Sequence, residues 1–165
     1  MSDRIIAIGL GELNVSGDPE TTLVAYGLGS CVGVAIYDPQ VRTGGMAHVV
    51  LPERVGGSQD DSGVGARYAD MAIDRLATEL ERAGGTRPRM VVKIAGGAQL
   101  LSLPLNGHRW DIGERNIVAV KRALSRNGLI LAAYEVGGSY GRTMRFQVRD
   151  GRVTVSTVGH SEMIL

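Results

Sequence analysis

The chain contains one cysteine, Cys31, and three histidines, of which His48 is the nearest to it in sequence. A cysteine attacks carbonyl carbon as the thiolate, and a neighbouring histidine can accept the thiol proton. The two residue types therefore predict nucleophilic catalysis if the fold brings them together. A lone cysteine among apolar residues is more often a small core side chain, so the prediction depends on the elements that position it.

A predicted β-hairpin places Cys31 beside His48. Residues 32–37 and 46–51 are β-prone, and a turn signal separates them. If residues 38–41 form the loop, Cys31 lies directly opposite His48, with Cβ atoms about 4.5–5.5 Å apart. We therefore expect a thiol–imidazole hydrogen bond. A bulge at the two glycines that open the second strand would instead turn the histidine to the other face.

The residues around Cys31 suit acyl transfer. Gly33 and Ala35 share its predicted face, and their small size predicts a shallow depression beside the thiol. Gly29 and Ser30 precede the cysteine in a glycine-rich turn. Backbone N–H groups of such a turn can hold a developing oxyanion, so these two residues are candidates for oxyanion or substrate binding.

Other binding chemistry has weaker support. Gly27 and Gly29 follow a β-rich segment, as in a dinucleotide-binding loop, but that motif requires a helix next and residues 32–37 are β-prone. The three histidines lack metal-ligand spacing, and a single cysteine excludes a multi-thiolate site. We expect no metal and no other cofactor.

Charge and hydropathy indicate which partners and which cellular compartment to expect. A net charge of +1 predicts no broad attraction to nucleic acid or to an anionic membrane. No apolar stretch approaches the ~20 residues that a membrane span needs. The first residues lack a signal-peptide pattern, and a free thiol persists in a reducing compartment, so we expect a cytoplasmic protein.

Length and patterning predict one α+β domain over residues 1–165. The chain is 44% hydrophobic, and its strands come in runs rather than alternating with helices. Apolar spacing predicts helices over 64–83, capped by Ser62, and over 111–127. Residues 12–19 are expected to form a loop. About seven or eight strands are expected, at 5–8, 21–26, 32–37, 46–51, 89–95, 129–136, 143–148 and 153–158.

Several ordered motifs resemble the CheD family of chemoreceptor glutamine deamidases, over about Ile5 to Val155. The resemblance implies a single-domain three-layer α/β/β sandwich with Cys31 as nucleophile and His48 as its partner. The motifs are Gly27-Leu28-Gly29-Ser30-Cys31-Val32, Tyr37-Asp38-Pro39, Gly45-Met46-Ala47-His48 with Leu51-Pro52, Lys93–Ala98, Ile112–Asn116 and Val136–Thr143.

One position departs from the family pattern. The resemblance implies a third catalytic residue, a threonine, at the place that Ala25 occupies. Thr22 is the nearest threonine upstream, about 10 Å away along a strand. The group that orients His48 would then be a backbone carbonyl, Tyr26 or the more distant Thr22. Otherwise the protein is a slower enzyme than its relatives, or a pseudoenzyme.

The resemblance implies two functions from different classes. The first is deamidation of glutamine side chains on the cytoplasmic helices of methyl-accepting chemotaxis receptors. The same acyl mechanism would also accept a methyl ester, so we consider methyl-ester hydrolysis as a side activity. The second is a non-catalytic adaptor that binds and stimulates the CheC phosphatase. An activated Cys31 should alkylate fast at pH 7, whereas a thiol pKa near or above 8.5, or protection from alkylation, favours the adaptor. A monomer is the default expectation.

A receptor helix is roughly 10 Å wide, so the deamidase hypothesis requires an open site. We expect Cys31 at the floor of an accessible depression. Two glycine-rich stretches, residues 55–65 and Gly137–Gly141, are expected to border it, with the first among the most mobile parts of the chain.

Overall fold

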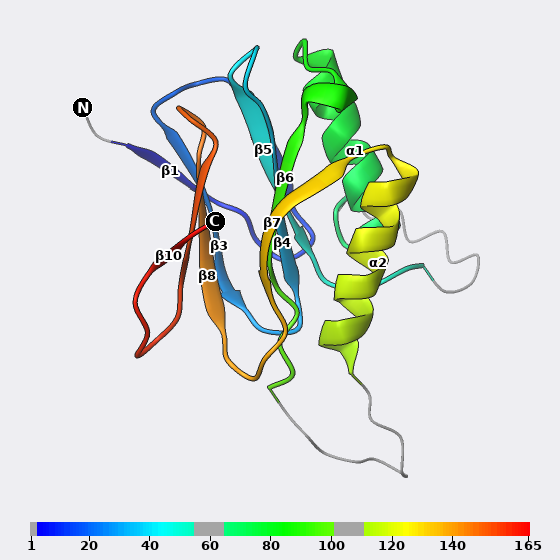
Figure 1. Ribbon diagram of the computed structural model, residues 1–165, viewed down its shortest axis with the longest axis vertical. Coiled ribbons are helices and arrows are strands. Elements are labelled where there is room, and N and C mark those ends of the chain that lie inside the picture. Colours follow the sequence, from blue (N-terminus) through cyan, green and yellow to red (C-terminus); the bar gives the residue numbers. More distant parts are fainter. Residues whose placement is uncertain (1–2, 55–64, 101–110) are drawn as a thin grey trace.

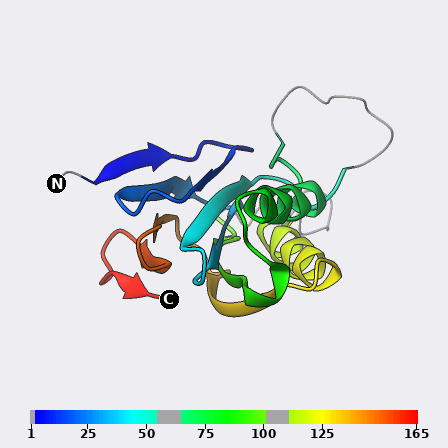
Figure 2. The same cartoon turned by 90° about the horizontal axis from the view of Figure 1, so that it is seen from above.

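Three layers of secondary structure make up the protein: an outer β-sheet, a central β-sheet and a pair of helices (Figure 1). The computed structural model describes residues 3–54, 65–100 and 111–165. Seen from above, the central sheet lies between the outer sheet and the helices (Figure 2). The expected α+β fold with an α/β/β arrangement is confirmed.

The outer sheet combines strands from both ends of the chain in the order β1-β3-β8-β9-β10. Strand β1 runs parallel to β3, and the other neighbours are antiparallel. Its strands are β1 (Arg4–Ala7), β3 (Thr21–Leu28), β8 (Arg142–Gln147), β9 (Arg152–Ser156) and β10 (Met163–Ile164).

The central sheet has the order β2-β5-β4-β6-β7, and only its β6–β7 pair is parallel among the described strands. Its strands are β2 (Leu13–Ser16), β4 (Val32–Asp38), β5 (Thr43–Val49), β6 (Val91–Gly96) and β7 (Ile130–Val136). The described residues thus contain ten strands. The expectation of a loop over 12–19 is wrong there, because β2 forms an edge strand on β5, and the short β10 was not expected.

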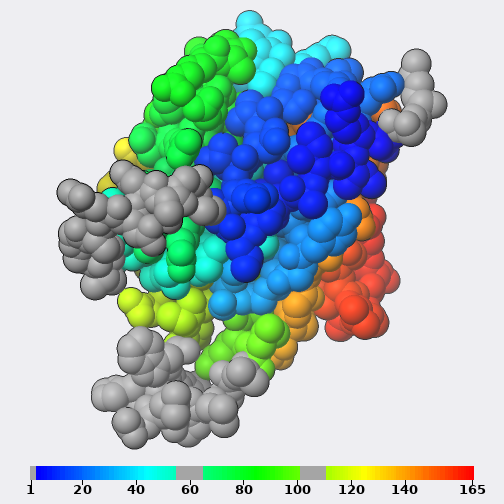
Figure 3. All heavy atoms as spheres, turned by 180° about the vertical axis from the view of Figure 1, so that it is seen from behind, coloured from blue at the N-terminus to red at the C-terminus, as the bar shows by residue number. Residues whose placement is uncertain are grey.

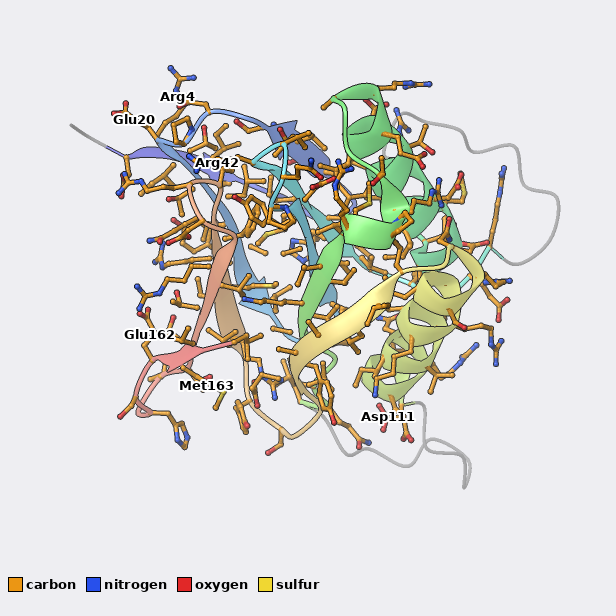
Figure 4. All side chains as sticks on the ribbon, turned by 45° about the horizontal axis from the view of Figure 1, so that its top comes forward. Arg4, Glu20, Arg42, Asp111, Glu162 and Met163 are labelled. Carbon is orange, nitrogen blue, oxygen red and sulfur yellow. The ribbon has the colours of Figure 1, made fainter. Side chains whose placement is uncertain are left out.

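Two helices cover the face of the central sheet that points away from the outer sheet. They are α1 (Ala69–Arg82) and α2 (Ile112–Arg126), and a short 3-10 helix, η1 (Arg87–Arg89), precedes β6. Helix α1 begins later than expected, and the proposed cap Ser62 lies outside the described residues. Asp111 caps α2 by accepting a hydrogen bond from the Glu114 backbone N–H at 2.9 Å (Figure 4). Neither described helix is long and apolar enough to cross a membrane.

Each face of β4 enters a different apolar core. Val34 and Ile36 pack with the helices, whereas Ala35 and Tyr37 pack between the two sheets, as alternation along a strand predicts. Cys31 belongs to the core between the sheets. The N-terminal residues that join β1 to β2 cross from the outer sheet to the central one over the rear of the molecule (Figure 3).

Candidate active site

Cys31 lies in the loop between β3 and β4. This loop is at the lower end of the sheets in Figure 1. Three successive carbonyls of this loop accept N–H donors from the residues after β6 and from α2. The bonds are Ala98 N to Gly29 O at 2.8 Å, Asn116 Nδ2 to Ser30 O at 2.9 Å and Gly97 N to Cys31 O at 2.8 Å. Because N–H and C=O point in opposite directions across a trans peptide, the N–H groups of Ser30 and Cys31 face away from these donors.

Burial determines the resting state of the thiol. Cys31 is only 9% exposed, and desolvation raises the pKa of its thiol, while its own backbone N–H lowers that pKa in part. The thiol is therefore protonated at neutral pH. The side chains of Met144 and Leu28 lie over Gly33, so they fill the shallow depression that we expected there.

The described residues enclose Cys31 rather than leaving it at the floor of an open depression. Loop 137–141 borders the site as expected, since Gly137 N donates to Gly96 O and Gln99 N donates to Gly138 O, both at 2.9 Å. The expected mobile stretch, residues 55–65, lies outside the described residues except for its last member.

His48 shares a face with Cys31 but does not lie directly opposite it. The β4–β5 register pairs His48 with Gly33, so the expected direct pairing is wrong. Because the shift is even, the histidine stays on the face of Cys31, which directly precedes the paired residues of β4 and belongs to the core between the sheets. The pairing runs without interruption through the two glycines of β5, so no bulge turns His48 away.

Asp38 explains the shifted register. Its buried carboxylate accepts hydrogen bonds from Gln40 N and Thr86 N and pairs with Arg89 at 2.8 Å. These partners keep Asp38 in β4, so the hairpin loop starts one residue later than the turn signal suggested. Arg42 completes the loop in a left-handed conformation, with φ 51°.

The two ring nitrogens of His48 differ in their surroundings. Nδ1 lies 2.9 Å from the carbonyl oxygen of Ile8, which can only accept, so Nδ1 carries the ring proton. Nε2 is buried and has no hydrogen-bond partner in the described residues. The expected thiol–imidazole hydrogen bond is therefore not formed, and Nε2 holds an unused lone pair on the side of the sheet that faces Cys31.

Ile8 supplies the backbone carbonyl that we considered as an orienter of His48. Tyr26 and Thr22 do not contact the ring: they share the outer face of β3, where Arg145 lies over the Tyr26 ring at 5.7 Å. Ala25 faces the inner core instead. A Cβ atom placed on Gly33 would lie 3.8 Å from the Ala25 Cβ.

Three supports of the site were missed by the sequence analysis: Ile8, Asn116 and the ion pair of buried Arg142 with Glu135. The pair borders the site, since Arg142 also donates to Gly96 O at 3.4 Å. Ile8 acts through its backbone and carries no sequence signal. Asn116 did carry one, because its amide interrupts the buried stripe of α2.

The arrangement suits thiol chemistry: a nucleophile, a free basic nitrogen on the same face and backbone N–H groups beside them. Within the described ranges, no three His, Cys, Asp or Glu side chains converge to hold a metal.

The family model described as "CheD chemotactic sensory transduction" matches residues 50–157 of this chain. A protein of Symbiobacterium thermophilum named "Probable chemoreceptor glutamine deamidase CheD" is 48% identical, over 98% of this chain and 98% of its own. "Chemoreceptor glutamine deamidase CheD" of Halalkalibacterium halodurans is 40% identical, over 96% of both chains. The solved hypothetical protein YfiH of Bacillus licheniformis aligns over 84% of this chain and 60% of its own, at 17% identity and a TM-score of 0.42. On the family model and these near full-length relatives, the chain belongs to the CheD family.

Proposed function

We propose that this protein is a cysteine-dependent protein-glutamine deamidase that acts on chemoreceptors in the cytoplasm. The names of its relatives support the activity and the substrate. The observation that carries the site assignment is the unpartnered Nε2 of His48 on the face of Cys31, with Nδ1 fixed by Ile8. A buried, unsatisfied lone pair destabilises a fold, and catalytic need accounts for its presence.

The reaction begins with a neutral pair. His48 Nε2 accepts the Cys31 proton as the sulfur attacks the carboxamide carbon of the substrate glutamine, and a C–S bond forms. The tetrahedral intermediate carries an oxyanion, which the N–H groups of Ser30 and Cys31 stabilise. Collapse breaks the C–N bond, and His48 gives its proton to the departing ammonia.

Water then completes the reaction. His48 Nε2 takes a proton from water as the oxygen attacks the thioester, and it passes that proton to the sulfur as the C–S bond breaks, which leaves glutamate and the free thiol. The net reaction adds one water and releases one ammonia for each glutamine. Each event adds one negative charge to a receptor helix, where repulsion between like charges shifts the balance of receptor states.

The test is incubation with the cytoplasmic fragment of a methyl-accepting chemotaxis receptor, followed by intact-mass analysis. We expect a gain of about 1 Da for each glutamine converted. His48→Gln should abolish most of that gain, while His160→Gln, on an exposed histidine that stacks with Tyr140, should retain it. A folded wild-type protein that leaves every receptor glutamine unchanged would refute the proposal.

A second candidate function is an adaptor that binds and stimulates the CheC phosphatase. Two observations favour it: the raised pKa of the Cys31 thiol and Ala25 in place of the family threonine. If the protein is an adaptor, the wild type and Cys31→Ala should stimulate the phosphatase to the same extent. We rank it second because an adaptor has no use for the unpaired His48 nitrogen.

A further inference from the structure

A buried amide on α2 connects the peptide that carries Cys31 to the strand that carries His48. Asn116 is fully buried, and its Nδ2 donates to Ser30 O and to Val50 O, each at 2.9 Å. Ser30 directly precedes Cys31, and Val50 follows β5. One side chain thus fixes both halves of the site from the helix layer.

Only one orientation of this amide fits its surroundings. Both neighbours are carbonyl oxygens, which accept but do not donate, so the NH2 group must face them. Asn116 Oδ1 then has no partner in the described residues. Asn116 lies in the apolar stripe of α2, although its buried Oδ1 has no hydrogen-bond partner among the residues that the structure describes. Its two donors are the part that the structure uses.

The bond to Ser30 O determines the direction of the Cys31 N–H. The two groups belong to one trans peptide, so fixing the carbonyl fixes the N–H on the opposite side. A hydrogen bond to the carbonyl also polarises the peptide and makes its N–H a stronger donor. The Cys31 N–H lies near its own sulfur and lowers the pKa of the thiol in part. It therefore faces the space in which the tetrahedral intermediate would form.

The helix is held close enough for Asn116 to reach the loop. Gly113 lies against the carbonyls of Gly97 and Ala98, where a Cβ atom would overlap backbone oxygen. Gly97 and Ala98 in turn donate to the carbonyls on either side of Ser30. The first turns of α2 and the loop of Cys31 therefore form one rigid unit.

We propose that Asn116 is a positioning residue of the deamidase, which aims and polarises the Cys31 N–H as an oxyanion donor while holding it in register with the His48 strand. This inference rests on the proposed function. Asn116 itself touches neither the thiol nor the substrate.

The test compares Asn116→Ala and Asn116→Ser with Asn127→Ala. Asn127 is a matched control, because it lies at the far end of α2 and donates to the Ala123 carbonyl within the helix. We expect the Asn116 variants to lose about 10- to 100-fold in kcat for deamidation, with KM changed less than about 3-fold. Asn127→Ala should keep the wild-type kcat at a comparable loss of thermal stability.

Alkylation separates positioning from general damage. Iodoacetamide reacts with the thiolate without forming an oxyanion, so a weaker Cys31 N–H slows it only through the thiol pKa, and its rate in the Asn116 variants should stay within about 3-fold of wild type. An equal loss of alkylation and deamidation would show that the site has collapsed and would overturn the proposal. A kcat within about 3-fold of wild type in a folded Asn116 variant would also overturn it.

A readout independent of activity is available because Cys31 is the only cysteine. Protein labelled with ¹⁵N-cysteine gives a single amide peak, which should move upfield in Asn116→Ala and stay in place in Asn127→Ala. An unmoved peak in Asn116→Ala overturns the inference. If the peak shifts in Asn116→Ala but the wild-type protein does not deamidate the receptor, the proposed function is refuted instead. The two failures are therefore distinguishable.

Discussion

At the scale of single residues, the proposed catalytic pair, His48 and Cys31, shares a face but is not hydrogen-bonded. The ring proton is committed to the Ile8 carbonyl, and Nε2 is left without a partner in the described residues. Burial keeps the thiol neutral. Separating charge in a buried site without substrate would be costly, so a neutral resting pair is the stable state. In the proposed reaction, proton transfer is then coupled to attack on the glutamine.

The raised thiol pKa predicts slow alkylation of Cys31 at pH 7. Since the reactive species is the thiolate, the rate should rise with pH and level off above the ordinary thiol value of about 8.5. The measurement is a pH series of iodoacetamide labelling, with the urea-unfolded chain as reference. Labelling of folded protein at pH 7 that is faster than labelling of the unfolded chain would contradict a raised pKa.

Ala25→Thr should not increase kcat. The Ile8 carbonyl already holds Nδ1 of His48, and Ala25 lies fully buried in the core between the sheets. The added atoms overpack that core, for a loss of about 1–3 kcal/mol in the free energy of unfolding. Deamidation kinetics and urea unfolding measure the two effects. An increase in kcat would contradict the proposed role of the Ile8 carbonyl as the group that orients His48.

At the scale of elements, the β4–β5 hairpin shows which features the sequence could predict. The alternation of β4 correctly separated the face of Cys31 from the face of Val34, and the turn signal located the loop to within one residue. The register followed from Asp38, whose partners Thr86 and Arg89 lie far along the chain. The contacts of Ile8 and Asn116 with the site likewise join distant segments, and local patterns do not report such contacts.

Asp38→Asn should destabilise the hairpin by about 2–3 kcal/mol, because it removes charge-assisted hydrogen bonds. Burial by itself would raise the pKa of Asp38, but Arg89 and the N–H groups of Thr86 and Gln40 hold it below its usual value of 3.8. The ionised carboxylate therefore stabilises the fold above that value, and this contribution is lost as the pH falls through the lowered pKa. Urea unfolding of both proteins from pH 7 to pH 2 measures it. A difference between them that stays constant over this range would contradict the assignment.

At the scale of the whole molecule, close approach of the two sheets positions the site. The chain leaves β1 in the outer sheet and enters β2 in the central sheet, and this crossing brings the Ile8 carbonyl to His48. Glycines on β4 and β5 allow the approach: Gly33 meets Met144, and Gly44 meets the Phe146 ring. The spacing of the layers thus fixes the distance between His48, the proposed base, and the Ile8 carbonyl.

Gly44→Ala should separate the sheets locally. Its Cβ atom would overlap the Phe146 ring and lie 3.0 Å from Ile36 O, so we expect a loss of about 1–3 kcal/mol in unfolding free energy. Gly141→Ala is the control, because a Cβ atom there meets only Leu28 O at 3.8 Å. Thermal unfolding compares the two variants. Equal melting temperatures would show that the space between the sheets accommodates a Cβ atom at residue 44.

In the proposed mechanism, the Cys31 sulfur forms the bond to the substrate glutamine. The most direct measurement is the mass of a receptor fragment with one reactive glutamine, after incubation with wild-type protein or with Cys31→Ala of equal thermal stability. We predict a gain of about 1 Da with the wild type and an unchanged mass with Cys31→Ala. A gain that persists with folded Cys31→Ala would contradict the account.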